Sequence, residues 1–83
     1  MDKKYMVIEI SERDLLDILY ADTLKEAIGI TNRLLEAWCK TLDVSLNEDD
    51  DGSEFMRASI ENQAAWCNLG NYNWDAYIAK CHN

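Results

Sequence analysis

Hydrophobic and polar residues alternate near the N-terminus, a pattern typical of a β-strand with one buried face. The alternation runs from Tyr5 to Ile10 and is followed by a polar connector, Ser11–Asp14. The side chains that it places on one face are Met6, Ile8 and Ile10, and those on the other face are Tyr5, Val7 and Glu9. A strand is therefore predicted for this stretch.

The next apolar segment, Leu15–Ala21, fits two structures. As a strand it would place Leu16, Ile18 and Tyr20 together and pair with the first strand as a hairpin. As a helix it would be capped by Ser11. We favour the strand, because another helix starts directly afterwards and two helices would be left almost without a loop.

The clearest element in the sequence is an amphipathic helix from Thr23 to about Leu42. Its apolar residues recur at spacings of three and four, which places them on one buried face. They are Leu24, Ala27, Ile28, Thr31, Leu34, Leu35, Trp38, Cys39 and Leu42. Asp22 or Thr23 can cap its first amides, and Gly29 weakens its middle by up to about 1 kcal/mol. At 1.5 Å per residue the helix is roughly 30 Å long, enough to span the domain.

The second half of the chain is less regular. An acidic turn, Asn47–Gly52, precedes a second helix that we expect to start at Ser53 and to end near Gly70. The inner side of this helix would consist of Phe55, Met56, Ser59, Ile60, Gln63, Trp66 and Cys67. The alternative is a hairpin in which Val44–Leu46 pairs with Phe55–Ile60 across the acidic turn. A last short helix would place Trp74, Tyr77, Ile78 and Cys81 on one face.

These elements predict an α+β fold. The length of 83 residues indicates one small domain over residues 1–83. Its order would be an N-terminal β-hairpin, then the long amphipathic helix, then one or two C-terminal helices.

The composition excludes several classes of protein. The chain has 16 acidic and 8 basic residues, a net charge of -8, and 48% hydrophobic residues. It is too apolar and too aromatic for wholesale disorder. It is too acidic to bind nucleic acid through the phosphate backbone. No apolar run approaches the roughly 20 residues of a membrane helix.

The N-terminal residues and the cysteines indicate a cytoplasmic protein. The apolar segment Met6–Ile8 is interrupted by Glu9, so it does not form the core of a signal peptide. The chain has 3 cysteines, and an odd number makes a poor disulfide framework. We expect these cysteines to be free thiols.

No group of residues points to catalysis, and we expect no enzyme activity, no catalytic residue and no cofactor. The only histidine, His82, is the penultimate residue. Its neighbour Cys81 would lie about 100° away around a helix, so the two side chains would not face each other. A zinc site needs ligands in closely spaced pairs, which the cysteines do not provide.

The acidic turn invites comparison with a calcium-binding EF-hand loop. Aligning Gly52 with the glycine of that loop puts Asn47, Asp49, Asp51 and Ser53 at its first, third, fifth and seventh positions. Ala58 then stands at the twelfth position, where a bidentate Glu should close the coordination sphere. We therefore expect no metal site, and weak calcium binding by this loop stays an open alternative.

Aromatic residues gather in the C-terminal third of the chain. Trp66, Trp74 and Tyr77 are expected to fill the core against the long helix. Tyr72 lies beside asparagines in a connector, and we expect it to be exposed at an interface, where tyrosine is enriched.

The segment Asn68-Leu69-Gly70-Asn71-Tyr72-Asn73 resembles the Asn-Leu-Gly-x-Tyr-Asn segment near the start of the acidic antirestriction proteins of conjugative elements. Proteins of that family mimic DNA and so block restriction enzymes, and the resemblance implies such mimicry here. It covers these six residues alone, and Trp74-Asp75 stand where that family usually has Glu-Gly. We assign no family on this segment.

The acidic residues are unevenly distributed. Residues 1–42 carry eight acids and six bases, a net charge of -2, whereas residues 43–83 carry eight acids and two bases, a net charge of -6. The second half is therefore where a basic partner should be sought.

We infer from these features an acidic, non-enzymatic interaction protein that binds a basic surface of a protein partner. One version is a phage or mobile-element inhibitor, of the anti-defence or anti-CRISPR kind, that occupies the nucleic-acid site of a host nuclease by mimicry. The chain itself would bind neither nucleic acid nor membrane. The residues expected to contact the partner are Glu48, Asp49, Asp50, Asp51, Glu54, Glu61 and Tyr72. The alternative is a dimeric or scaffold-type interaction module that uses an apolar, aromatic helix face.

Overall fold

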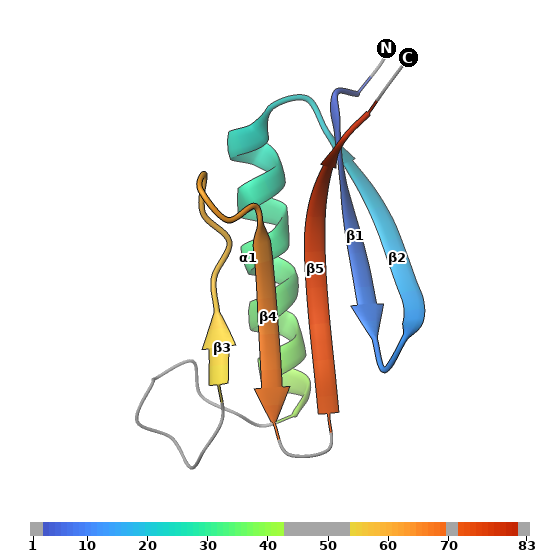
Figure 1. The fold of residues 1–83 in the computed structure, drawn as a ribbon, viewed down its shortest axis with the longest axis vertical. Coiled ribbons are helices and arrows are strands. Elements are labelled where there is room, and N and C mark those ends of the chain that lie inside the picture. The colour runs from blue at the N-terminus through green and yellow to red at the C-terminus, as the bar shows by residue number, and fades with distance from the viewer. Residues whose placement is uncertain (1–2, 43–53, 70–71, 82–83) are drawn as a thin grey trace.

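An antiparallel sheet and one helix make up the described part of the chain in the computed structural model, which comprises residues 3–42, 54–69 and 72–81. The strands are β1 (Tyr5–Ser11), β2 (Asp14–Ala21), β3 (Glu54–Met56), β4 (Ala64–Leu69) and β5 (Tyr72–Lys80), and the helix is α1 (Leu24–Thr41). The five strands follow the order β2-β1-β5-β4-β3 (Figure 1). The N-terminal and C-terminal strands are therefore neighbours in the sheet, and the predicted α+β class is confirmed.

The N-terminal hairpin is confirmed, with a tighter turn than expected. The two residues between β1 and β2, Glu12 and Arg13, have φ values of 50° and 73°. Two positive φ values are the mark of a type I′ turn, which usually selects Asn and Gly. The turn is held by Asn73 of β5, whose backbone N–H donates to Glu12 Oε1 at 2.9 Å and whose carbonyl accepts the Glu12 N–H at 3.1 Å.

The hairpin register contains one irregularity. Glu9 pairs with Asp17, but Ile10 pairs with Leu15, so Leu16 is an extra residue in β2. Such a bulge interrupts the alternation of side chains. Ile18 and Tyr20 share a sheet face as predicted, and Leu15 replaces Leu16 as the residue opposite Ile10 on that face.

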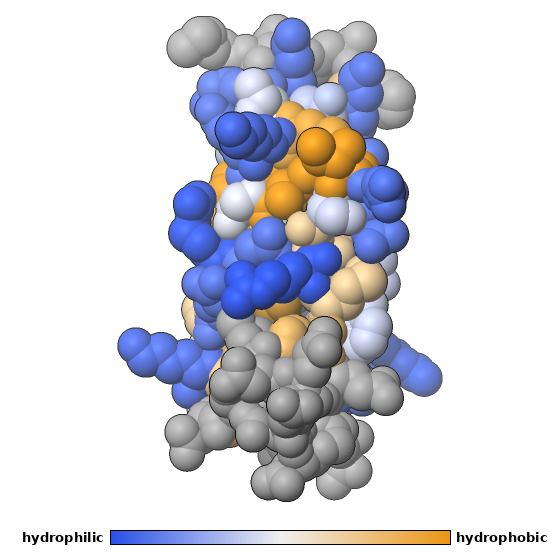
Figure 2. Space-filling model, turned by 90° about the vertical axis from the view of Figure 1, so that its left-hand side faces the viewer, coloured by the Kyte–Doolittle hydropathy of each residue, from blue (hydrophilic) through white to orange (hydrophobic). Residues whose placement is uncertain are grey.

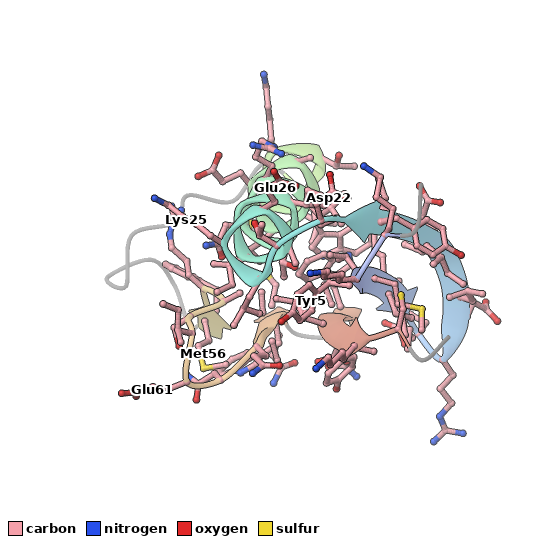
Figure 3. The ribbon with its side chains drawn as sticks, turned by 90° about the horizontal axis from the view of Figure 1, so that it is seen from above. Tyr5, Asp22, Lys25, Glu26, Met56 and Glu61 are labelled. Atoms are coloured by element: carbon pink, nitrogen blue, oxygen red, sulfur yellow. The ribbon has the colours of Figure 1, made fainter. Side chains whose placement is uncertain are left out.

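The long helix agrees with its prediction in bounds, cap and buried face. Thr23 Oγ1 accepts the backbone N–H of Glu26 at 3.1 Å, as an N-cap residue does. Glu26 in turn accepts the backbone N–H of Asp22 at 3.2 Å, and Figure 3 shows the two residues side by side at the start of α1. The fully buried positions of the helix are Ala27, Thr31, Leu35 and Cys39.

The core lies between α1 and one face of the sheet. Figure 3 shows the helix on that side only, with Tyr5 pointing into the space between the helix and the sheet. Small residues of β4 and β5, Ala65 and Ala76, pair directly across the sheet and are buried beneath α1. Because they have no bulk beyond Cβ, the helix can approach the sheet closely. The remaining buried apolar side chains include Val7, Ala21, Ala58, Cys67, Trp74 and Ile78.

The predicted C-terminal helices are wrong. The segment expected to form the second helix contains β3, an irregular stretch and β4, and the last predicted helix is β5. In β5 the buried residues are Trp74, Ala76 and Ile78, an alternation with period two. The residues between β4 and β5 are Gly70-Asn71, a pair typical of a two-residue hairpin loop rather than of a helix end.

Of the hairpin alternative for the second half, the described residues show one strand, which is shorter than predicted. A strand is present at Glu54–Met56, but it pairs with β4 and lies at the edge of the sheet. Its predicted partner, Val44–Leu46, lies outside the described residues. Residues 57–63, between β3 and β4, are held to the helix by Asn32, which accepts the Ala58 N–H at 2.7 Å and donates to the Ala58 carbonyl at 3.2 Å.

Candidate functional site

The face of the sheet that points away from α1 is covered by no element of the described structure (Figure 3). Figure 1 looks onto it, with β4 and β5 in front of the helix. We call it the outer face and define it by the residues that alternate with the buried ones and pair with one another across the strands. They are Met6, Ile8, Ile10, Leu15, Ile18, Tyr20, Met56, Ala64, Trp66, Asn68, Asn73, Asp75, Tyr77 and Ala79.

Strand pairing arranges the outer face in rows. One row runs Ile18, Ile8, Tyr77, Ala64 from β2 to β4. The next runs Leu15, Ile10, Asp75, Trp66, Met56 from β2 to β3. Residues directly opposite in such rows have Cβ atoms about 4.5–5.5 Å apart, so their side chains form a continuous surface.

This surface is apolar and accessible. Leu15 is 59% exposed, Ile18 38%, Tyr20 55% and Tyr77 46%. At roughly 200 Å² for a large side chain, these four alone present about 400 Å² to solvent. The half-buried Met6, Ile8, Ile10 and Trp66 add to that area. The largest apolar patch on a typical monomer is about 300–600 Å² and is often functional, and this surface falls within that range.

The outer face carries far fewer charged side chains than the outer side of the helix. Among the fourteen defining residues of the outer face the one charged side chain is Asp75, and Glu54, whose backbone pairs with Asn68, adds a second acidic residue at the start of β3. The exposed positions of α1 are largely charged, namely Lys25, Glu26, Arg33, Glu36 and Lys40. The helix therefore has an ordinary solvated surface, whereas the outer face does not.

A hollow of about 790 Å³ lies on the outer face beside the β1–β2 turn. Its lining includes Trp66, Asp75 and Tyr77, the amides Asn68 and Asn73, and the turn residues Glu12 and Arg13. Asp75 pairs with Ile10 on one side and with Trp66 on the other, so its carboxylate lies in the middle of a row. Tyr77 is in the neighbouring row on the same strand.

The electrostatics of the hollow centre on Asp75. The ion pairs found among the described residues are Lys3–Asp22 and Arg57–Glu36, so in that part of the chain no cation lies within 4.0 Å of Asp75. Burial, and then the nearby Asp75 carboxylate, raise the pKa of Tyr77. The phenol therefore stays neutral well above physiological pH. Asp75 supplies negative charge and the two rings supply π-faces.

A partly buried hydrogen bond lies beneath the hollow, on the helix side of the sheet. Trp74 is 1% exposed on the helix side of β5, and its Nε1 donates to Glu9 Oε2 of β1 at 2.8 Å. Charged acceptors make such bonds shorter and stronger than neutral ones. The bond joins the two strands directly beneath the row that contains Asp75.

The residues predicted to bind a partner are not gathered at one place in the described structure. Glu48, Asp49, Asp50 and Asp51 lie outside the described residues. Glu54 begins β3, where it pairs with Asn68, and Tyr72 begins β5, where it pairs with Leu69. Glu61 is exposed in the turn before β4, at the opposite end of that strand (Figure 3).

The aromatic predictions are mixed. Trp74 fills the core as expected. The prediction that Tyr77 fills the core is wrong, because Tyr77 lies on the outer face and is 46% exposed. Trp66 is half-buried on the same face, so it does not pack against the long helix as predicted. The signal that could have found this face is the period-two alternation of Asp75 and Tyr77 with buried neighbours, together with the hairpin pair Gly70-Asn71.

A second exposed apolar position lies at the other edge of the sheet. Ile60, in the turn between β3 and β4, is 70% exposed. Figure 2 views the molecule from the side of β3 and shows hydrophobic surface gathered in its upper half, bordered by hydrophilic side chains. Ile60 is not a member of the rows of the outer face, which makes it a useful reference position.

Within the described ranges the cysteines form neither a disulfide nor a metal cluster. Cys39 of α1 and Cys67 of β4 are buried, with their Sγ atoms 3.8 Å apart, and both are free thiols, as is Cys81. Across the residues described, no three His, Cys, Asp or Glu side chains gather as metal ligands. The only histidine, His82, and the acidic loop compared with a calcium site lie outside them.

The described helix does not have the length and apolar character that crossing a membrane requires. No protein-family model matches the chain, and neither a curated protein nor a solved structure matches it.

Proposed function

We propose that the chain is a non-enzymatic protein-interaction module that docks on a partner through the outer face of its sheet. The observation that carries the proposal is the pair of neighbouring rows that contain the exposed apolar side chains Leu15, Ile18 and Tyr77. No element of the described chain covers these rows. Burying such area is the main favourable term in protein association. Each side of a stable interface contributes roughly 800 Å², so a partner would have to cover more of the face than its four most exposed side chains.

The partner is a protein with basic groups around an apolar contact. The apolar rows of the outer face offer no complement to the phosphates of a nucleic acid. All eight bases but only ten of the sixteen acids fall within the described residues, which leaves the described part of the chain with a net charge of -2. We place the interaction in the cytoplasm, on the composition of the chain.

The aromatic interaction surface of this proposal lies on the sheet. The sequence had suggested an apolar helix face for that role, but α1 turns its apolar side into the core, with Leu35 and Cys39 fully buried.

A second candidate function is inhibition of a nucleic-acid-binding protein by mimicry. Six of the sixteen acids, and none of the bases, fall outside the described residues, and four of these acids are consecutive from Glu48 to Asp51. Carboxylates can pair with the arginines and lysines that normally hold phosphates. Replacing Asp49, Asp50 and Asp51 by Asn should then abolish a salt-sensitive complex. Mimicry is refuted if the complex survives that change.

The docking proposal is tested by a double substitution on the outer face, Ile18→Gln with Tyr20→Gln. Both side chains are exposed on edge strand β2, so the fold should tolerate the change. The control is Ile60→Gln, which removes a more exposed apolar side chain away from the outer face. A partner isolated with the wild-type chain and then purified should bind the control normally and the double variant at least about tenfold more weakly, because two large contacts are lost. Equal binding by all three chains refutes docking through the outer face.

A further inference from the structure

The hollow on the outer face has a chemical character that the surrounding apolar rows lack. Its floor is the row of Ile10, Asp75 and Trp66, and Tyr77 borders it from the next row. Trp66 lies directly across from Asp75 on β4, and Tyr77 lies two residues along β5 on the same face. The two aromatic residues therefore border the carboxylate on adjacent sides.

The charges that line the hollow are Glu12, Arg13 and Asp75, for a net charge of -1. Glu12 is already engaged, because its Oε1 accepts the backbone N–H of Asn73 at 2.9 Å. Arg13 is exposed in the hairpin turn. Neither of the two ion pairs in the described chain includes Asp75 or Arg13. Asp75 interacts with the Tyr77 phenol but has no ion pair within the described chain, so its charge is available to a cation.

We propose that this hollow receives an arginine side chain of the protein partner. The inference rests on the docking function proposed above and names the partner group that the site selects. A guanidinium can form an ion pair with the Asp75 carboxylate by donating hydrogen bonds to it, and it can lie against the faces of Trp66 and Tyr77. The side-chain oxygens of Asn68 and Asn73, both lining residues, can accept its remaining N–H groups.

The surroundings favour an arginine carried by a protein over a small free cation. The hollow continues into the apolar row of Leu15 and Ile10 without a boundary, and Leu15 is 59% exposed. A small cation would leave this apolar surface in water. A partner segment that inserts one arginine and lays apolar neighbours on the adjoining row would cover both.

The test uses two peptides that differ in one group. Acetyl-Ile-Arg-Ile-amide and the same peptide with citrulline have nearly the same shape, but citrulline is neutral. Each is titrated into the full ¹⁵N-labelled chain while the indole N–H signal of Trp66 is followed by NMR. We expect a saturable shift with the arginine peptide and about fivefold or more weaker binding of the citrulline peptide, from the loss of the ion pair and the cation–π contact.

Matched variants of the chain assign the effect to the hollow. Asp75→Asn should weaken binding of the arginine peptide by about fivefold and leave citrulline binding unchanged. Asp17→Asn is the control, an exposed acid on β2 outside the outer face whose hydrogen bond from the Ile18 N–H an Asn side chain can keep. Tyr77→Leu serves as a second variant, and it should weaken binding through loss of a ring face. The spectrum of each variant shows directly whether it is folded.

Three results would overturn the inference: no saturable shift of the Trp66 signal, equal affinity for the two peptides, or unchanged affinity in folded Asp75→Asn. The proposed function fails separately. If the Ile18 and Tyr20 double variant loses the partner while the peptides do not discriminate, docking stands and the arginine is wrong. If that variant keeps its partner while the peptides do discriminate, the hollow binds arginine and docking through the whole outer face is wrong.

Discussion

Replacing Glu9 by methionine removes the acceptor of the buried Trp74 indole N–H, and we expect this change to destabilise the chain markedly. The bond is 2.8 Å long and has a charged acceptor, while Trp74 is 1% exposed. A fully buried indole donor left without a partner costs about 1–3 kcal/mol, and because this bond is only partly buried we expect Glu9→Met to lose about 1–2 kcal/mol. A chain of this length has a total stability of roughly 4–12 kcal/mol, so the loss is a large share.

The measurement is urea unfolding followed by far-ultraviolet circular dichroism, which does not depend on the tryptophan that is changed. Four chains complete a double-mutant cycle: wild type, Glu9→Met, Trp74→Phe and the double variant. Trp74→Phe removes the donor and leaves a smaller ring in the core, so it is destabilising by itself. The double variant should be more stable than the sum of the single losses predicts, by about 1–2 kcal/mol, because neither polar group is left unpaired in the core.

Glu36→Met is the matched control. Glu36 pairs with Arg57 at 2.8 Å, the same length as the Glu9 bond, but both side chains are about half exposed. Such surface pairs contribute about 0–1 kcal/mol. If Glu9→Met is as stable as Glu36→Met, or if the cycle shows no coupling, the reasoning about the Glu9 bond is refuted.

The other predictions concern the helix, the turn and the thiols. Gly29→Ala should stabilise the chain by about 0.5–1 kcal/mol in urea unfolding, because the only nearby atom to an added Cβ is 3.9 Å away and alanine favours helix; a loss of stability would contradict this. Arg13→Gly should raise the melting temperature, because glycine adopts the φ of 73° without strain; an unchanged or lower value would count against a strained turn. Native alkylation with iodoacetamide should modify Cys81 ahead of the buried Cys39 and Cys67, as read by peptide mass spectrometry; equal rates would show that the core opens readily. Burial, and then Cys67, raise the pKa of Cys39 from 9.0 to about 12. The contribution of this protonated thiol to stability should therefore be full below pH 9 and fall as the pH rises towards 12. In urea unfolding at several pH values, Cys39→Ala should lose less stability between pH 9 and 12 than the wild type.

The N-terminal half of the fold could be predicted because its signals are local and agree with one another. The period of Tyr5–Ile10 is two, and the period of the helix after Thr23 is three to four over several turns. Thr23 also provides the cap that the structure uses. Where pattern, cap and length indicate the same element, sequence reasoning succeeds.

The C-terminal half could not be predicted because its apolar residues fit both periods. Trp74, Tyr77 and Ile78 lie on one face of a helix, but Trp74 and Ile78 also share a face of a strand from which Tyr77 points away. Long-range pairing with β1 decides between them, and that contact is not visible in local sequence. The outer face was missed for the same reason, since its rows draw residues from all five strands.

An apolar face that no described element covers invites self-association, and the chain opposes it in two ways. Two copies that met face to face would bring together two net charges of -8, which repel at ordinary ionic strength. The edge strand β2 resists strand addition, because it contains a bulge at Leu16 and because Asp17 Oδ1 accepts the Ile18 N–H at 2.8 Å. A basic partner is not repelled by the negative charge of the chain. If it docks on the side chains of the outer face, it does not have to pair with the edge of β2. The outer face is therefore suited to a different protein rather than to a second copy.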